Sequence, residues 1–189
     1  MTLLLSLAAG VFSWTFAEYA IHNWVGHKTR GRTEFSREHL AHHRDTRYFS
    51  PNAKKVTAAV PVIVPMGIVS VFAAGWVHGL AFTLAFAATY VAYEVLHRRT
   101  HTHAPVGPHA RWARRHHLHH HYRNANSNHG VTSPLWDWVF GTLEPCGQVK
   151  IPRSKAPSWM VDGEREIRAP YREDYVLVGP RARIEVAAK

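Results

Sequence analysis

Two long stretches of this chain contain neither lysine nor arginine, and they constrain the fold more than any other feature. Residues 1–27 and 56–97 lack both, although the 189-residue chain carries 23 of these basic residues. The apolar run at residues 3–21 holds one acid, Glu18, and at ~1.5 Å rise per residue it nearly crosses a hydrocarbon core of ~30 Å. A secretory signal would need a basic start and a small-residue cleavage site, and neither is evident. We therefore expect a membrane helix at residues 3–21.

The second stretch is long enough for two membrane spans. Among residues 56–96, the only side chain charged at neutral pH is Glu94, and a weakly polar break at residues 75–79 divides the stretch. Each half is about long enough to cross a bilayer, which predicts a helical hairpin with spans at about 57–75 and 79–96. The alternative is a buried hairpin of a soluble protein, and the length without charge argues against it.

The distribution of basic residues predicts the topology. If the hairpin leaves and re-enters on one side, residues 28–55 and everything after residue 97 share that side, which then holds every Lys and Arg. The positive-inside rule makes it cytosolic, with the N-terminus outside. We expect an all-α, multi-pass integral membrane protein of about three transmembrane helices, capped by a cytosolic helical histidine-rich domain. We expect residues 1–145 to form a single integral-membrane domain that includes the spans, and residues 146–189 to form a cytosolic extension with a short strand-like patch at 175–178 and no assigned chemistry.

Histidine is the unusual component: there are 16, and ten fall into four spaced clusters. On a helix, residues three or four apart lie on one face, so three of the clusters can each point two imidazoles at one place. The first pair is five apart and does not align on a regular helix; it converges if the helix ends near Gly26. The candidate ligands are His22 and His27; His39, His42 and His43; His97 and His101; and His117, His120 and His121.

All four clusters are expected on the same membrane face. Ten imidazoles exceed the four ligands of one tetrahedral metal and fit two metals. Imidazole suits Fe, Zn, Cu and Ni, so the ligand type leaves the element open. A site beside the bilayer favours chemistry on a lipid, and two irons can activate O₂ where redox-inert zinc cannot. The single cysteine, Cys146, excludes an internal disulfide and a cysteine-ligated iron–sulfur centre.

Two acids are candidates to support the ligands. Glu94 lies one turn before His97, where it can hydrogen-bond the imidazole and fix its tautomer, or extend to the membrane interface instead. Asp137 can play a similar part or bond backbone amides. The other histidines near the clusters are expected to support the site or lie on the surface: His103, His109, His116, His119 and His129.

The ordered clusters H-x4-H, H-x2-H-H, H-x3-H and H-x2-H-H, followed by GVTSPLWDWVFGT at residues 130–142, resemble the fatty acid hydroxylase superfamily, which includes sterol desaturases. The resemblance runs from His22 to about Leu143. It implies membrane helices capped by a cytosolic di-metal centre and carries metal ligation to all ten candidate histidines. For the last cluster, His116/His119/His120 has the same spacing, but Tyr122 following the H-H pair, as in the family, favours the register that begins at His117.

The resemblance also implies a function. It is the O₂-dependent oxidation of a membrane lipid, such as a fatty acyl chain or a sterol or isoprenoid, by hydroxylation or desaturation. The cofactor is two non-haem iron ions, for which zinc can substitute in preparations. The sequence holds no H-P-G-G haem motif, so we expect a separate electron donor, either a ferredoxin or a b-type cytochrome.

Other functions stay open from the sequence. A carotenoid hydroxylase is a related histidine-rich enzyme, although the GVTSPLWD segment favours the fatty acid hydroxylase group. A membrane metal-binding or transport protein would place ligands along a path through the bilayer, whereas these lie beyond the helix ends. The net charge of +10 suggests nucleic acid, but the charge-free spans and the lack of a nucleic-acid motif argue against that partner.

Overall fold

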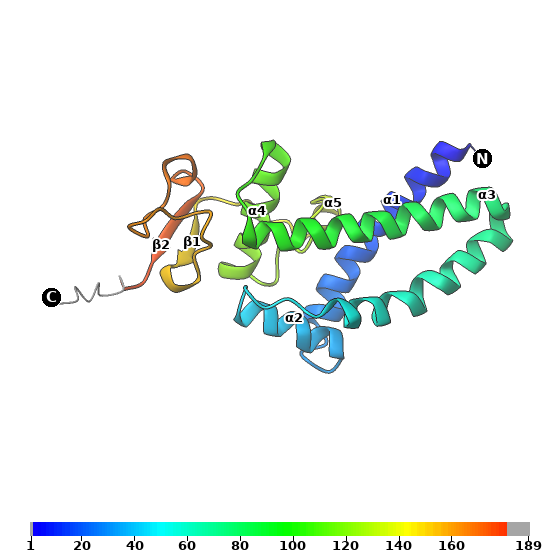
Figure 1. Ribbon diagram of the computed structural model, residues 1–189, viewed down its shortest axis with the longest axis horizontal. Helices are drawn as coiled ribbons and strands as arrows, with labels where there is room; N and C mark the ends of the chain where they lie inside the picture. Colours follow the sequence, from blue (N-terminus) through cyan, green and yellow to red (C-terminus); the bar gives the residue numbers. More distant parts are fainter. Residues whose placement is uncertain (1, 181–189) are drawn as a thin grey trace.

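The structure is a computed structural model that describes residues 2–180, and it is mostly helical (Figure 1). Met1 and residues 181–189, the end of the expected extension, lie outside the described residues. The first long helical rod crosses the two arms of a helical hairpin, and the shorter helices gather at the end opposite the N-terminus (Figure 1). The fold therefore separates an apolar helical body from a histidine-rich end.

The first rod is α1 (Leu3–Ala20), which the Thr2 side chain caps by accepting from the amide of Leu5. Its sequence is apolar on all sides, which is typical of a helix surrounded by protein and lipid. The chain continues without a break into a π-helical segment, Ile21–His27, in which the Lys28 amide bonds the Asn23 carbonyl five residues back at 3.0 Å.

The other two rods are the arms of α3 (Asn52–Thr102), which doubles back at Gly75 (Figure 1). Gly75 has φ 78° and ψ 161°, a conformation that glycine adopts without steric cost. The arms then approach closely, because a Cβ on Gly79 would lie 2.5 Å from the Val71 amide nitrogen. The predicted hairpin is present, but the reversal takes one residue instead of 75–79, and both arms extend beyond the predicted spans.

Within residues 2–180, two segments are long and apolar enough to cross a membrane: Leu3–His27 and Asn52–Thr102. Large apolar side chains on both point outward, with Leu4 76% and Phe72 87% exposed. Exposed apolar surface on this scale marks a face that meets lipid or another protein.

α1 packs tightly on the second arm of α3. Trp14 is buried against the rings of Phe86, Tyr90 and Tyr93, with centroids 5.3, 4.9 and 5.5 Å away. Gly10 lets the backbones meet, because a Cβ there would contact the Phe82 carbonyl and lie 2.9 Å from the Ala85 Cβ. This packing fixes the end of α1 relative to the end of α3, where the histidines lie.

The histidine-rich end is built from α2 (Glu34–Arg44), α4 (Gly107–Tyr122) and α5 (Leu135–Val139). Thr33 caps α2 by accepting from the Ser36 amide at 3.1 Å. Because α2 and α4 carry little apolar surface, they stay at the end of the body instead of entering it.

The last part of the described chain is a small module with its own apolar core. β1 (Val149–Pro152) pairs in parallel with β2 (Tyr175–Val178), which matches the predicted strand-like patch, and 3₁₀ turns occur at Arg153–Lys155 and Ala169–Tyr171. The all-α prediction is corrected to a mostly helical fold by this sheet. The core joins the module to α4 through Leu118, Val149, Ile151, Trp159, Met160, Val161, Ile167 and Tyr175.

We predict that Gly10→Val destabilises the protein by ~1–3 kcal/mol, because the added side chain overpacks the contact between α1 and α3. Thermal unfolding in detergent measures the loss. Ala9→Val is the matched control, because Ala9 is exposed on the same helix. Equal melting temperatures for the two variants would contradict this packing.

Candidate metal centre

The ten predicted ligands converge in two groups of five. In each group, one donor atom from every histidine lies within 4.8 Å of the others. The first group draws on the π segment, α2 and α4, and the second draws on α2, α3 and α4. The groups are His22, His27, His39, His43 and His120, and His42, His97, His101, His117 and His121.

The π-helical segment explains how the first pair converges. The sequence allowed the pair to converge if the helix ended near Gly26; instead the helix continues to His27 with i→i+5 bonding. This wider turn brings residues five apart to the same side, so the rings of His22 and His27 lie 5.4 Å apart. The H-x4-H spacing therefore suits a π-helix.

Each of α2 and α4 serves both groups. On α4, His117 and His121 are four residues apart and share one face, while His120 points into the other group. On α2, His39 and His43 are likewise four residues apart and point into the first group, whereas His42 points into the second. The His43 and His121 rings stack at 4.1 Å, so the two groups are direct neighbours.

The nitrogen spacings do not suit ordinary hydrogen bonding. The Nε2 atom of His120 lies 3.0, 3.0 and 3.1 Å from the Nε2 atoms of His22, His27 and His43. One ring nitrogen cannot satisfy three others, because it carries either one proton or one lone pair. Two imidazoles bound to one metal at ~2.1 Å and at right angles have nitrogens about 3.0 Å apart, so these spacings fit a shared cation.

The second group shows the same spacing. His117 Nε2 lies 2.9 Å from His101 Nε2 and 3.0 Å from His121 Nε2, and His42 Nε2 lies 3.2 Å from His101 Nε2. His97 Nε2 is buried without a hydrogen-bond partner in the described part of the chain. An unpartnered buried imidazole nitrogen is costly unless a ligand binds it, so this group also fits a metal.

Backbone carbonyls set the tautomers of three ligands. His42 Nδ1 donates to the Tyr48 carbonyl at 2.7 Å, His120 Nδ1 donates to the Ser127 carbonyl at 2.7 Å, and His22 Nδ1 donates to the His129 carbonyl. A donating Nδ1–H leaves the lone pair on Nε2, which is the atom facing the group.

Burial keeps the imidazoles neutral. It lowers the pKa of His43 to about 3, with neighbouring imidazoles adding to the effect. Burial likewise lowers the pKa values of His39, His117, His120 and His121 well below the usual histidine range. At neutral pH these rings are therefore uncharged and able to bind a metal.

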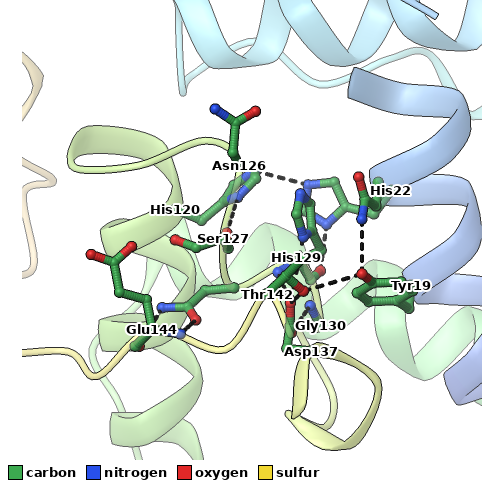
Figure 2. A network of polar contacts seen from close by, with 12 residues as sticks. Tyr19, His22, His120, Asn126, Ser127, His129, Gly130, Asp137, Thr142 and Glu144 are labelled. Atoms are coloured by element: carbon green, nitrogen blue, oxygen red, sulfur yellow. Dashed lines mark hydrogen bonds and ion pairs between the residues drawn. The ribbon is translucent and has the colours of Figure 1, made fainter. Parts of the chain in front are cut away.

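Two buried carboxylates hold the loop behind the first group. Asp137 accepts from the amides of His129 and Gly130, both at 2.8 Å (Figure 2). Glu18 accepts from the next two amides, those of Val131 and Thr132, the latter at 2.9 Å. Four successive amides are thus fixed, and this positions the His129 carbonyl that bonds His22. The GVTS segment of the sequence thus forms part of this loop, and the aspartate of LWDW, Asp137, holds it through hydrogen bonds.

The acid predictions had different outcomes. Asp137 bonds backbone amides, as one prediction allowed, and also lies 3.3 Å from His116 Nε2. Burial would raise its pKa, but hydrogen bonds from His116, His129 and the two amides keep it below the usual range. Glu94, for which the sequence left a bond to His97 or extension to the interface open, pairs with Lys55 on the other arm of α3. Glu18 was not predicted as a site residue, although it is the lone acid of the first apolar run.

The other histidines lie outside both groups. His116 faces Asp137 while His117 enters the second group, which is the register that the sequence favoured. His119 lies 3.4 Å from Glu144, and His103 and His109 are exposed.

An apolar cavity of about 480 Å³ opens beside the two groups. His39 lines it from the first group, and His42 and His97 line it from the second. Its apolar wall comes from α1, the π-helical segment, α2 and α3 and includes Trp14, Ile21, Phe35, Val62 and Phe86. The histidine groups therefore face a space suited to an apolar chain.

Comparison with known proteins agrees with this arrangement. The chain is 32% identical over 163 residues to a dihydroceramide fatty acyl 2-hydroxylase of Arabidopsis thaliana, covering 78% of this chain and 61% of that protein. It is 30% identical over 149 residues to a ceramide very long chain fatty acid hydroxylase of Schizosaccharomyces pombe, covering 72% and 41%. The chain thus spans less than two thirds of the length of these relatives.

A solved structure is also similar. Full-length scs7p, in which only the hydroxylase domain is visible, matches with a TM-score of 0.60 and 28% identity over 79% of this chain and 60% of that one. The fatty acid hydroxylase family matches residues 7–142, a range that contains all ten converging histidines and the loop held by Glu18 and Asp137. The chain therefore belongs to the fatty acid hydroxylase family.

Proposed function

We propose that the protein is a metal-dependent membrane enzyme that hydroxylates the fatty acyl chain of a lipid. The observation that carries this proposal is the pair of five-histidine groups facing one apolar cavity. The relatives add support, because their names describe hydroxylation of the fatty acyl chains of ceramides and dihydroceramides.

The reaction needs two electrons from outside. A C–H bond, O₂, two electrons and two protons give an alcohol and water, so the enzyme requires a donor such as a ferredoxin or a b-type cytochrome. Two iron ions, one held by each histidine group, would supply the reductive activation of O₂. Zinc fits the same imidazoles but has no redox chemistry.

The protein itself holds the metal ligands and the acyl chain in position and excludes water from the site. The carbonyls of Tyr48, Ser127 and His129 hold three ligands in the tautomer that binds metal. The apolar wall of the cavity holds the acyl chain beside His42 and His97 and keeps water away from the reacting carbon.

We also propose the predicted membrane arrangement: three spans, one from α1 and two from α3, with the histidine groups on the cytosolic side. The outward apolar side chains of α1 and α3 support it. The N-terminus and the reversal of α3 lie at the end away from α2 and α4 (Figure 1), and the basic segments lie at the histidine end. This basic side is suited to docking an acidic electron donor.

The function is tested by lipid analysis. Membranes from a host that expresses the protein should contain hydroxylated acyl lipids when O₂ is present, detected by mass spectrometry. His120→Ala and His121→Ala should each reduce product at least ~100-fold, because each removes a metal ligand from one group. His103→Ala is the control, since His103 is exposed. Full activity in both ligand variants would refute the proposed centre.

Metal content provides a separate prediction. The purified protein should hold about two metal ions per chain, because ten imidazoles form two groups of five. His120→Ala should weaken binding at one site and His121→Ala at the other, measured by elemental analysis after dialysis. A stoichiometry of one metal in the unaltered protein would contradict the two-site interpretation.

Asp137→Asn should weaken metal binding ~10–100-fold, because Asp137 orders the loop whose carbonyl fixes His22. Competition with a chelator measures the affinity. Glu173→Gln provides the control, since the Glu173 side chain is 93% exposed. If Asp137→Asn retains the affinity of the unaltered protein, the loop does not position the ligand.

A further inference from the structure

Lys55 and Glu94 form one of the charged pairs that line the apolar cavity, and this pair has no part in the metal centre. Lys55, near the start of α3, pairs with Glu94, near its end. Both residues line the cavity together with His42 and His97. Their side chains are only 22% and 24% exposed.

Holding the two arms of α3 together does not require this pair. The arms are already joined at Gly75 and packed together at Gly79. A partly buried ion pair also contributes little net stability, because desolvation offsets the attraction between the charges. An ion pair in the wall of an apolar cavity is therefore better explained by recognition of a polar group.

The pair has hydrogen-bonding capacity to spare. Within residues 2–180, the ammonium of Lys55 donates to one partner, Glu94 Oε2, which leaves two of its N–H donors available. Glu94 Oε1 has no hydrogen-bond partner in the same residues and can accept. The cavity therefore presents a donor and an acceptor side by side.

This arrangement matches a secondary amide. The carbonyl of the amide can accept from Lys55 while its N–H donates to Glu94. A free carboxylate has no N–H to offer and meets the negative charge of Glu94, and an ester also lacks the N–H. A site with buried polar groups discriminates strongly against a ligand that leaves them unpaired.

We propose that Lys55 and Glu94 are specificity-determining residues that recognise the amide of a lipid whose acyl chain is joined through nitrogen. This inference rests on the proposed function, because it takes the cavity as the substrate site. Glu94 lies one helical turn before His97, so an amide held by the pair places the adjoining acyl carbons beside the second histidine group.

The test is equilibrium binding to the purified protein with its metal bound, in detergent and without an electron donor so that no turnover occurs, read by displacement of a fluorescent acyl probe. Three ligands share one acyl chain: N-hexadecanoylethanolamine, hexadecanoate and methyl hexadecanoate. The unaltered protein should prefer the amide over the fatty acid by ~10–100-fold, the range expected for hydrogen bonds to charged groups.

The two variants should change this preference in different ways. Lys55→Met should lower affinity for the amide ~10-fold, because it removes the donor to the carbonyl. Glu94→Gln should raise affinity for hexadecanoate, because the ammonium of Lys55 is then free to bind a carboxylate. The amide preference should therefore shrink or reverse.

Lys54→Met and Glu38→Gln are the matched controls. Lys54, 47% exposed, lies next to Lys55 and pairs with Glu38 at 2.8 Å at the rim of the same cavity. Both Glu38 oxygens are already bonded, Oε1 by Lys54 and Oε2 by the Tyr48 hydroxyl, so this pair offers no spare acceptor. The amide preference of these two variants should stay that of the unaltered protein. An unchanged preference in Lys55→Met and Glu94→Gln, or an equal change in the rim controls, would overturn the inference.

The binding assay separates this inference from the proposed function. Amide selectivity that depends on Lys55 and Glu94, without any hydroxylated product, would support the recognition pair and refute the enzyme. Hydroxylated product together with an amide selectivity that depends on neither residue would support the enzyme and refute the recognition pair. Thermal unfolding of each variant checks that the change in selectivity arises in a folded protein.

Discussion

The structure depends on one physical constraint: buried, neutral imidazoles whose lone pairs face one another. Such an arrangement is unfavourable by itself, because each ring nitrogen has been removed from water and meets other lone pairs in place of donors. A cation between them turns the same geometry into a binding site. The donors come from the π segment, α2, α3 and α4, so binding metal also ties together elements that have little apolar surface with which to pack.

The remaining parts of the molecule keep these rings in place. The tight contact of α1 with α3 at Gly10 and Trp14 sets where the two rods end. The amides behind the first group are held by Glu18 from α1 and Asp137 from α5, so this loop links both helices to the ligand His22. The C-terminal module joins in through Leu118 of α4, and Lys155 donates to the Arg44 carbonyl at the end of α2. The C-terminal module thereby holds α4 and α2 in position, and these are the helices that supply histidines to both groups.

Sequence reasoning succeeded where local spacing decides the geometry. The apolar runs predicted the rods, and the three- and four-residue spacings predicted which imidazoles share a face. It failed where partners distant in sequence compete. Glu94 was a candidate partner of His97, one turn away, but the folded hairpin brings Lys55 within reach. The link between Glu18 and residues 131–132 spans more than 100 residues and has no local pattern.

The sequence by itself determined the helical rods, the reversal near Gly75 and the identity of the ten converging histidines, because periodicity, charge and spacing are local properties. Only the tertiary structure decided how the ten divide into two groups, since α2 and α4 each direct histidines to both and the partition depends on how the helices pack. It also decided that the segment at Ile21–His27 is π-helical, because a five-residue spacing becomes favourable only when His39, His43 and His120 meet it from other elements.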